Sequence, residues 1–358
     1  MRLLLSGYYG FGNLGDEAIL DVIVAQIKRV LPNVHLDVLS AAPQETAQRL
    51  GVEATQRWEV RSVRESIERA DALLSGGGGL LQSATSLRSL LYYAGIIRQG
   101  VRRGIKTMIF AQSIGPLDGM GTLAVRRLCR GVNRATVRDE RSRALLSSLL
   151  PQTPVERTAD PVFLYDAPPA NLELEGLGPA SQPYAIVSVR EAPGFNASLA
   201  TIARAVDRLA SRGLRVAFLP LGGARDAGAA TSVIRACESA PMLLPQPTLA
   251  RAAAILGGAA LVVGMRLHAL VLAARACVPF VAIPYDPKID ALVEDLRYPL
   301  PALPLVRRGA RRPDVESLVD EAVAESGRLA QHLRERIDGV RSLAQRNFDV
   351  LADLLASA

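Results

Sequence analysis

Short apolar segments of strand length alternate with segments of helical periodicity along almost the whole chain, and this alternation constrains the fold most. Runs of Val, Ile and Leu, each followed by an amphipathic helical pattern, are typical of βαβ units and hence of parallel sheets. The first half should contain the strands Arg2–Ser6, Val34–Leu39, Ala72–Ser75, Thr107–Ala111, Ala135–Arg138 and Val155–Thr158. The second half should contain Tyr184–Val189, Arg215–Leu219, Met242–Leu244, Ala260–Val263 and Phe280–Ile283. The sequence therefore predicts an α/β protein with mainly parallel sheets.

The chain has 358 residues, and at roughly 150 residues per domain this length favours two domains. We expect an N-terminal Rossmann-like domain over residues 1–168, a proline-rich linker over 169–183 and a C-terminal Rossmann-like domain over 184–312. Residues 313–358 should be helical, and a terminal helix of this kind is a candidate to cross back to the first domain. In open α/β sheets, ligands bind beyond the carboxyl ends of the strands, so the loops there are the candidate sites.

Composition excludes several classes of protein. No stretch reaches the roughly 18 to 20 apolar residues of a membrane-spanning helix, and the apolar start of the chain is too short for a signal peptide, so we expect a cytoplasmic protein. The three cysteines are far apart and fit neither a disulfide framework nor a metal site. A net charge of +7 fits anionic substrates or an anionic membrane surface. Aromatic residues make up only 4%, without a basic-aromatic stripe, which argues against nucleic acid.

The first candidate loop runs from Gly7 to Glu17 and contains the spelling G-x-G-x-x-G. Dinucleotide binding is disfavoured, because two carboxylates stand where a pyrophosphate would lie and no acid follows the second strand to hold a ribose. We expect a ligand-contacting loop that includes Gly12, with Asn13, Asp16 and Glu17 as polar residues. A tight turn with Asp16 as a helix cap is the structural alternative.

Two further loops of the first domain carry candidate contacts. The four glycines after the third predicted strand, among them Gly77 and Gly78, could direct backbone N–H groups at an anion or could serve close packing. Gln112 and Ser113 follow the next strand and could hydrogen-bond a sugar. Asp139 is expected to cap a helix, which leaves open why an arginine, Arg138, ends the preceding strand.

The second domain carries the strongest signal, the turn Gly264-Met265-Arg266-Leu267-His268 after an apolar strand. Arginine can hold a carboxylate or phosphate in a bidentate fork, and histidine titrates near neutral pH and can act as a general acid or base. Ser188 and Arg190 end the first strand of this domain on one side of it. Lys288, one of three lysines, lies just after another strand and could bind phosphate.

Taken in order, these motifs resemble those of the polysaccharide pyruvyltransferases, and most closely those of the bacterial cell-surface-anchoring type. The resemblance extends from about residue 3 to residue 290. The motifs that carry it are Gly7–Gly10 with Gly12–Glu17, Gly76–Gly79, Gln112–Pro116, Ser188–Arg190 and Gly264–His268.

This resemblance implies a GT-B-like fold of two Rossmann-type domains facing a central cleft. It implies transfer of pyruvate from phosphoenolpyruvate to two hydroxyls of a sugar, as a cyclic ketal with release of phosphate. In the cell-surface type the acceptor is an N-acetylmannosamine unit of a secondary cell-wall polysaccharide precursor, whose product tethers surface-layer proteins. The family's essential histidine and arginine correspond to His268 and Arg266, and a further arginine to Arg190. No metal and no nicotinamide cofactor is implied.

These residues then take roles as hypotheses. His268 is the general acid, and the donor is held by Arg266, Leu267, Arg190, Ser188 and Lys288. The acceptor would contact the loops of the first domain, through Gly12, Asn13, Asp16, Glu17, Gly77, Gly78, Gln112 and Ser113. A lipid-linked acceptor would bring the enzyme to the inner leaflet of the membrane. The alternatives are a GT-B glycosyltransferase or sugar-nucleotide epimerase, and a non-catalytic protein that binds sugar or phosphate.

Overall fold

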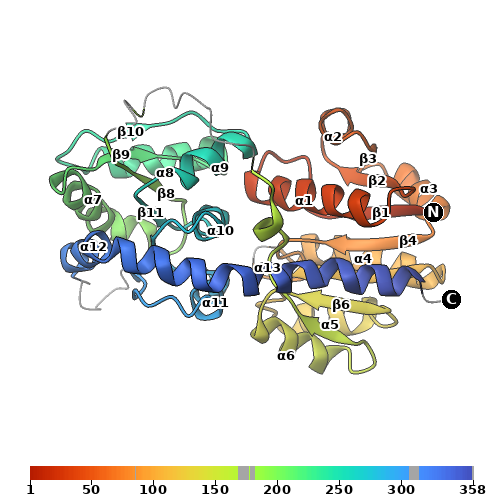
Figure 1. The fold of residues 1–358 in the computed structure, drawn as a ribbon. Coiled ribbons are helices and arrows are strands. Elements are labelled where there is room, and N and C mark those ends of the chain that lie inside the picture. The colour runs from red at the N-terminus through yellow and green to blue at the C-terminus, as the bar shows by residue number, and fades with distance from the viewer. Residues whose placement is uncertain (85, 168–176, 178–181, 306–313, 357–358) are drawn as a thin grey trace. The chain divides into compact units, whose positions relative to one another are not determined.

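The computed structural model describes residues 1–84, 86–167, 177, 182–305 and 314–356, and the chain divides into two compact units. The first unit is Met1–Tyr165 together with Arg341–Ala358, and the second is Asp166–Val340. Most of the predicted linker over 169–183 lies outside the described residues, as does the end of the predicted second domain. Each unit is a parallel sheet with its own helices (Figure 1).

The first unit is built on a seven-stranded sheet in the order β3-β2-β1-β4-β5-β6-β7, and all neighbouring strands are parallel. Its strands are β1 (Arg2–Ser6), β2 (His35–Ser40), β3 (Glu53–Gln56), β4 (Ala72–Gly76), β5 (Lys106–Gln112), β6 (Arg134–Val137) and β7 (Val155–Arg157). Its helices are α1 (Leu14–Val30), α2 (Pro43–Leu50), α3 (Val60–Arg69), α4 (Leu87–Arg102), α5 (Gly119–Leu128), α6 (Glu140–Leu149) and the 3₁₀ helix η1 (Pro161–Leu164).

The second unit is built on a five-stranded parallel sheet in the order β10-β9-β8-β11-β12. Its strands are β8 (Tyr184–Ser188), β9 (Arg215–Phe218), β10 (Met242–Leu243), β11 (Leu261–Gly264) and β12 (Phe280–Ala282). Its helices are α7 (Phe195–Ser211), α8 (Ala224–Ile234), α9 (Leu249–Gly257), α10 (Leu267–Arg275), α11 (Pro287–Asp295) and α12 (Val315–Ala324).

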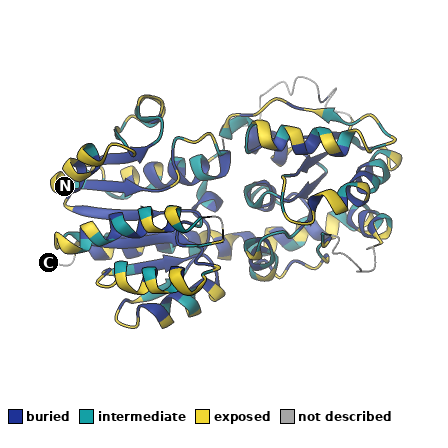
Figure 2. Cartoon of the chain, turned by 180° about the vertical axis from the view of Figure 1, so that it is seen from behind, coloured by how far each residue is buried: buried dark blue, intermediate teal, exposed yellow. Residues whose placement is uncertain are grey.

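The apolar runs in the sequence form the central strands of the two sheets, because helices cover both faces of each sheet. Every residue of β4, β8 and β11 is buried, as expected for parallel strands between two helix layers. Figure 2 shows the sheets in dark blue, with exposed positions concentrated on the helices and loops. The predicted α/β class with parallel sheets is confirmed. The edge strand β3, with the partly exposed sequence Glu-Ala-Thr-Gln, was not predicted.

The last helix, α13 (Ser326–Ala356), contributes its first half to the second unit and its second half to the first. Within the second unit, the predicted apolar positions Leu329 and Leu333 are fully buried. Within the first unit, Phe348 is fully buried and its ring centroid lies 5.2 Å from that of Phe110 on β5. Asn347 donates to the Ala159 carbonyl and accepts from the Thr158 hydroxyl. The end of α13 is thus part of the core of the first unit.

No helix in the described part of the chain is both long enough and apolar enough to span a membrane.

Candidate functional site

The turn between β11 and α10 lies at the carboxyl edge of the second sheet. The buried Met265 donates its N–H to the Ser188 carbonyl, at 2.7 Å, and Ile283 donates to the Gly264 carbonyl, at 2.8 Å. These bonds tie the turn to the ends of the two neighbouring strands, β8 and β12. A Cβ at Gly264 would come within 2.6 Å of Leu270, so the turn is also tightly packed against its own helix. The sequence prediction of a tight turn at this place is confirmed.

Arg266 stands at the N-cap of α10, and Leu267 and His268 form the first turn of that helix. His268 is half-buried, and the short spacing brings the side chains of Arg266 and His268 to the N-terminal end of one helix. This end of a helix carries a partial positive charge and unsatisfied N–H groups, which favour an anion. The arrangement is therefore suited to a carboxylate or a phosphate.

The guanidinium of Arg266 is held by a carboxylate that the sequence analysis did not single out. Asp226, in the first turn of α8 and 1% exposed, accepts from Arg266 Nε at 2.7 Å and also from Nη2. The same carboxylate accepts from the Gly222 N–H at 2.7 Å. A Cβ at Gly222 would overlap the guanidinium, so the glycine turn before α8 makes room for Arg266. Asp226 thus fixes one edge of the guanidinium and leaves the edge that includes Nη1 for other partners.

Arg190 follows β8 and packs on Tyr285, which follows β12. Its Nη1 donates to the Tyr285 hydroxyl at 2.8 Å, and its guanidinium carbon lies 4.9 Å from the centre of the ring. Burial raises the pKa of the Tyr285 phenol, while the positive charges of Arg190 and Arg266 act against that rise. Both arginines therefore act electrostatically on Tyr285, and Arg190, Arg266 and Tyr285 follow the ends of β8, β11 and β12, respectively.

Ser188 and Lys288 occupy different environments from these arginines. Ser188 is fully buried, and its hydroxyl donates to the Leu219 carbonyl on the neighbouring strand, which makes it a support of the sheet in this structure. Lys288 lies in the first turn of α11, with its Nζ 3.8 Å from the carboxylate of Asp286. Asp286 also caps α11, so the lysine is held near the helix start.

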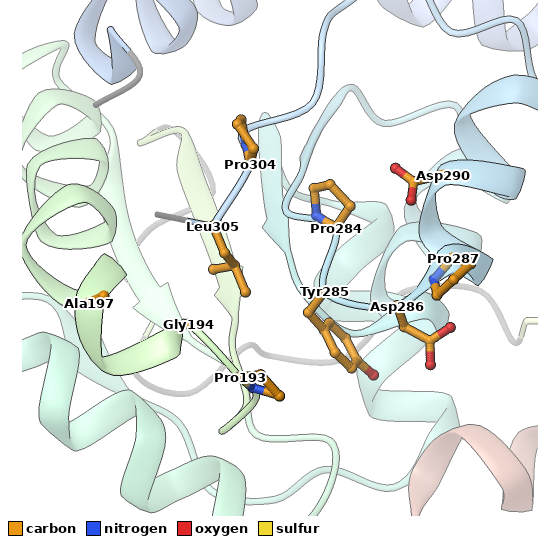
Figure 3. A pocket seen from close by; sticks show the side chains of 10 residues that line it. All are labelled: Pro193, Gly194, Ala197, Pro284, Tyr285, Asp286, Pro287, Asp290, Pro304 and Leu305. Carbon is orange, nitrogen blue, oxygen red and sulfur yellow. The ribbon is translucent and has the colours of Figure 1, made fainter. Parts of the chain in front are cut away.

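A cavity of about 800 Å³ opens beside Tyr285, within the size range of small-molecule sites (Figure 3). Its walls come from the start of α7, the β12–α11 loop and a later segment, and the lining residues are Pro193, Gly194, Ala197, Pro284, Tyr285, Asp286, Pro287, Asp290, Pro304 and Leu305. Its charged lining groups are two carboxylates. Its walls therefore suit hydroxyl-bearing or cationic groups. An anion would bind more favourably to the arginines near Tyr285.

The two glycine loops of the first unit pack against each other. A Cβ at Gly77 would overlap Ile19 of α1, and one at Gly78 would lie 2.8 Å from the Asp16 carboxylate. Both glycines have positive φ and are buried, so close packing explains them. Gly12, in contrast, is exposed, and a Cβ at this position would meet no neighbouring atom.

The polar residues of the first loop form a connected group at the start of α1. The helix begins at Leu14 with Asn13 as its N-cap, so Asp16 lies in the first turn and is not the cap. Asn13 donates its side-chain amide to Asp16. Glu17 accepts from the Gly10 N–H at 2.7 Å and forms an ion pair with Arg49 at 2.5 Å. Burial raises the pKa of Glu17, and the positive charge of Arg49 opposes that rise.

The structure places Gln112 and Ser113 in the interior of the first unit, at 0% and 4% exposure. Gln112 donates to the Ser75 carbonyl at 2.8 Å, and the Ser113 hydroxyl accepts from Arg138 at 3.0 Å. Arg138 also forms a buried ion pair with Asp160, which explains why an arginine stands directly after β6. Gln112 and Ser113 thus stabilise the loops of the first unit. The expectation that these two side chains face a sugar is not met in this structure.

Five aromatic side chains that sequence reasoning missed gather at the carboxyl edge of the first sheet around one arginine. Arg57 follows β3, and four ring centres lie between 4.7 and 5.2 Å from its guanidinium carbon. The residues are Tyr8, Phe11, Trp58, Tyr92 and Tyr93, and they form a chain of ring contacts. No periodic pattern could have revealed them, because they come from three separate segments.

A comparison with known protein families identifies the family to which the chain belongs. The family model described as polysaccharide pyruvyl transferase matches residues 13–287, well over half of the chain. The chain belongs to this family. The matched range includes every predicted site residue except Gly12 and Lys288. No match was found among curated proteins.

Solved structures show the fold that this polysaccharide pyruvyl transferase adopts. The UDP-GlcNAc 2-epimerase of Neisseria meningitidis, solved with UDP-GlcNAc, matches with a TM-score of 0.63 at 11% identity, over 99% of this chain and 100% of that one. Anabaena HepE, solved with UDP and glucose, matches with 0.65 at 11% identity over 99% and 100%. The sucrose-phosphate synthase of Thermosynechococcus elongatus matches with 0.66 at 11% identity over the whole of both chains. These similarities show a GT-B-like fold.

Proposed function

We propose that this member of the family transfers pyruvate from phosphoenolpyruvate to two hydroxyls of a sugar, as a cyclic ketal. The observation that carries the proposal is the basic end of α10, where Arg266 and His268 follow β11 within a chain matched by the family model. Phosphoenolpyruvate carries a carboxylate and a phosphate, and both need cationic partners. Arg266 and Arg190 supply fixed positive charge beside Tyr285.

The reaction requires one proton at C3 of the donor, and His268 is the residue proposed to deliver it. Protonation of the enol carbon makes C2 electrophilic, and the first sugar hydroxyl adds to C2 and returns a proton to His268. The C–O bond to phosphate then breaks, and the second hydroxyl closes the ketal at C2. Its proton leaves with the phosphate, so that one diol and one phosphoenolpyruvate give one ketal and one hydrogen phosphate. Arg266, oriented by Asp226, would balance the negative charge of the donor through the guanidinium edge that includes Nη1.

The finer identity of the acceptor is proposed from the sequence resemblance alone. It is an N-acetylmannosamine unit of a secondary cell-wall polysaccharide precursor, used in surface-layer anchoring, and the site of action is the cytoplasm. A lipid-linked form of that acceptor would bring the enzyme to the inner face of the membrane. The carboxylates of the first loop, Asp16 and Glu17, are candidates to contact the acceptor hydroxyls.

Phosphate release from phosphoenolpyruvate across a panel of sugar acceptors tests the proposal, with the ketal product identified by mass spectrometry. General acids contribute about 10² to 10⁴-fold in rate, so His268→Ala should lose turnover on that scale while the fold persists. His35→Ala is the matched control, because His35 is an exposed residue at the start of β2, and it should leave turnover unchanged. Near-normal turnover by His268→Ala would contradict the assignment of His268 as the general acid.

Thermal shift experiments separate this proposal from a nucleotide-sugar enzyme of the same fold. Stabilisation by phosphoenolpyruvate supports pyruvyl transfer. Stabilisation by UDP-sugars without any response to phosphoenolpyruvate would favour a glycosyltransferase or epimerase. Binding of donor and acceptor without phosphate release would indicate a non-catalytic binding protein.

A further inference from the structure

The aromatic platform, which we define as Tyr8, Phe11 and Trp58, exposes large apolar rings at the carboxyl edge of the first sheet. Tyr8 and Phe11 stack with ring centroids 4.1 Å apart, and Phe11 meets Trp58 edge-on at 6.1 Å. Their exposed fractions are 38%, 37% and 60%. Single exposed apolar residues are common, but a connected group of rings on a protein surface usually marks a binding site.

A buried arginine fixes this platform in place. Arg57 is only 3% exposed, and it donates to the Gly7 carbonyl at 2.7 Å and to the Tyr93 hydroxyl at 2.9 Å. Its guanidinium lies 4.9 Å from both the Phe11 and the Trp58 ring centres, close enough for cation–π attraction. Because the rings are held before a ligand arrives, little side-chain freedom remains to be lost on binding.

The polar surroundings of the platform indicate what it binds. Phe11 is followed directly by Gly12 and Asn13, and Asp16 and Glu17 lie in the first turn of α1, which begins at Leu14. Aromatic faces beside amide and carboxylate groups match a sugar ring, which presents C–H groups on one face and hydroxyls around its edge. The pairing of Arg49 with Glu17 and Asp21 leaves no excess of positive charge at this end of α1 to attract an anionic lipid surface.

The basic residues nearest in sequence do not favour a membrane either. Arg61 and Arg64 of α3 form ion pairs with Glu65 and Glu68 one helical turn away, so the charges of these two arginines are compensated within the helix. Interfacial membrane helices instead combine an apolar face with an excess of Lys and Arg. The observations therefore favour a carbohydrate over a lipid surface.

We propose that the aromatic platform of Tyr8, Phe11 and Trp58 binds a pyranose ring of the acceptor glycan by stacking. This inference rests on the proposed pyruvyl transfer for the name of the ligand, and its test is a binding measurement that needs no turnover. Asn13, the N-cap of α1, and Asp16, in its first turn, then contact the hydroxyls at the edge of that ring.

Trp58 is the single tryptophan of the chain, so its fluorescence reports on the platform alone. The full-length protein is titrated with the methyl glycosides of N-acetylmannosamine, N-acetylglucosamine, glucose and galactose, and with N,N′-diacetylchitobiose. A saturable change in emission with at least one of these sugars is expected. Vesicles of phosphatidylcholine and phosphatidylglycerol are titrated in parallel. A response to vesicles without a response to any sugar would overturn the inference in favour of a membrane contact, and no response to either would also overturn it.

Phe11→Ala removes the ring on which Tyr8 stacks, and thus the support of the platform, and it keeps Trp58 as the reporter. Loss of one aromatic contact should weaken sugar binding by about five- to tenfold. Met120→Ala is the control, because Met120 is a 62% exposed apolar residue on α5, and it should bind sugar as the parent does. Near-ultraviolet circular dichroism checks that both variants are folded. Parental affinity in a folded Phe11→Ala would contradict stacking.

The two proposals fail separately. If the sugar titration succeeds and phosphoenolpyruvate yields no phosphate with any acceptor, the platform stands and pyruvyl transfer is lost. If phosphate is released and Phe11→Ala has the parental KM for the acceptor, pyruvyl transfer stands and the platform is lost.

Discussion

Replacing Asp226 by Asn tests whether this carboxylate holds Arg266 in place. The substitution keeps the shape and one acceptor oxygen, so the Gly222 N–H can still be satisfied, but it removes the negative charge that faces the guanidinium. Removing one partner of a buried ion pair typically costs about 3 to 5 kcal/mol, because the other charge is left uncompensated. The Arg266 side chain is 16% exposed and keeps some contact with water, so we expect the lower end.

A loss of about 3 kcal/mol corresponds to a melting temperature roughly 6 to 12 °C lower for a unit of this size. Thermal melts followed by circular dichroism measure this shift, and the KM for phosphoenolpyruvate should rise as well, since the guanidinium is no longer oriented. Arg266→Met combined with Asp226→Asn should lose less stability than the sum of the two single changes. A single variant that melts within about 1 °C of the parent, with an unchanged KM, would refute the positioning role.

Three further predictions follow from contacts described above. Gly222→Ala should raise the KM for phosphoenolpyruvate, because the new Cβ overlaps the guanidinium of Arg266; an unchanged KM would contradict this. Burial raises the pKa of Glu17, so its ionisation destabilises the fold increasingly as pH rises through its unfolded and then its folded pKa. Glu17→Gln should therefore raise the melting temperature more at pH 7 than at pH 4, and the reverse order would contradict the buried carboxylate. Arg208 and Arg212 lower the pKa of Asp320, so its contribution to stability is present above the unfolded pKa and is lost as pH falls through the folded pKa. Asp320→Asn should lower the melting temperature at pH 7 in low salt and have less effect at pH 3 or in 1 M NaCl; a loss independent of pH and salt would exclude an electrostatic cause.

The sheet strands could be predicted from the sequence because parallel strands covered on both faces must be apolar almost throughout. The strands β1, β4, β8 and β11 are such runs, and their predicted bounds lie within one or two residues of those observed. The edge strand β3 escaped prediction because it is short, polar and only partly buried, so that pairing with β2 alone defines it.

The positions of side chains at the strand ends were harder to predict. Gln112 and Ser113 follow a strand, as ligand-binding residues often do, but the pairing of β5 with β6 shifts register between Ile109 and Gln112. Ala111 there has a φ of 47°, and such an irregularity changes which face the next side chains occupy. Regular alternation therefore does not hold through the end of β5, and the sequence alone does not show that Gln112 and Ser113 are buried.

Partners distant in the sequence could not be predicted at all. Asp226 lies 40 positions from Arg266, and nothing in the local sequence marks it as the partner of that arginine. The aromatic platform brings together residues near positions 10 and 58, and it depends on a buried arginine that contacts ring faces, a backbone carbonyl and a hydroxyl. A single sequence carries no signal for contacts of this kind, since neither spacing nor composition marks them.

Because the C-terminal half of α13 belongs to the first unit, it affects how that unit can fold during synthesis. A ribosome releases β1 to β7 first, but Phe348 and Asn347, which complete the core beside Phe110 and Thr158, emerge only after the entire second unit. Domains that fold as they are synthesised usually do so in order from the N-terminus. In this protein the core of the first unit stays incomplete, with an apolar surface uncovered, until the C-terminal half of α13 has been synthesised. A premature stop or frameshift anywhere after Lys288 would spare every predicted site residue and still leave the first unit unfinished.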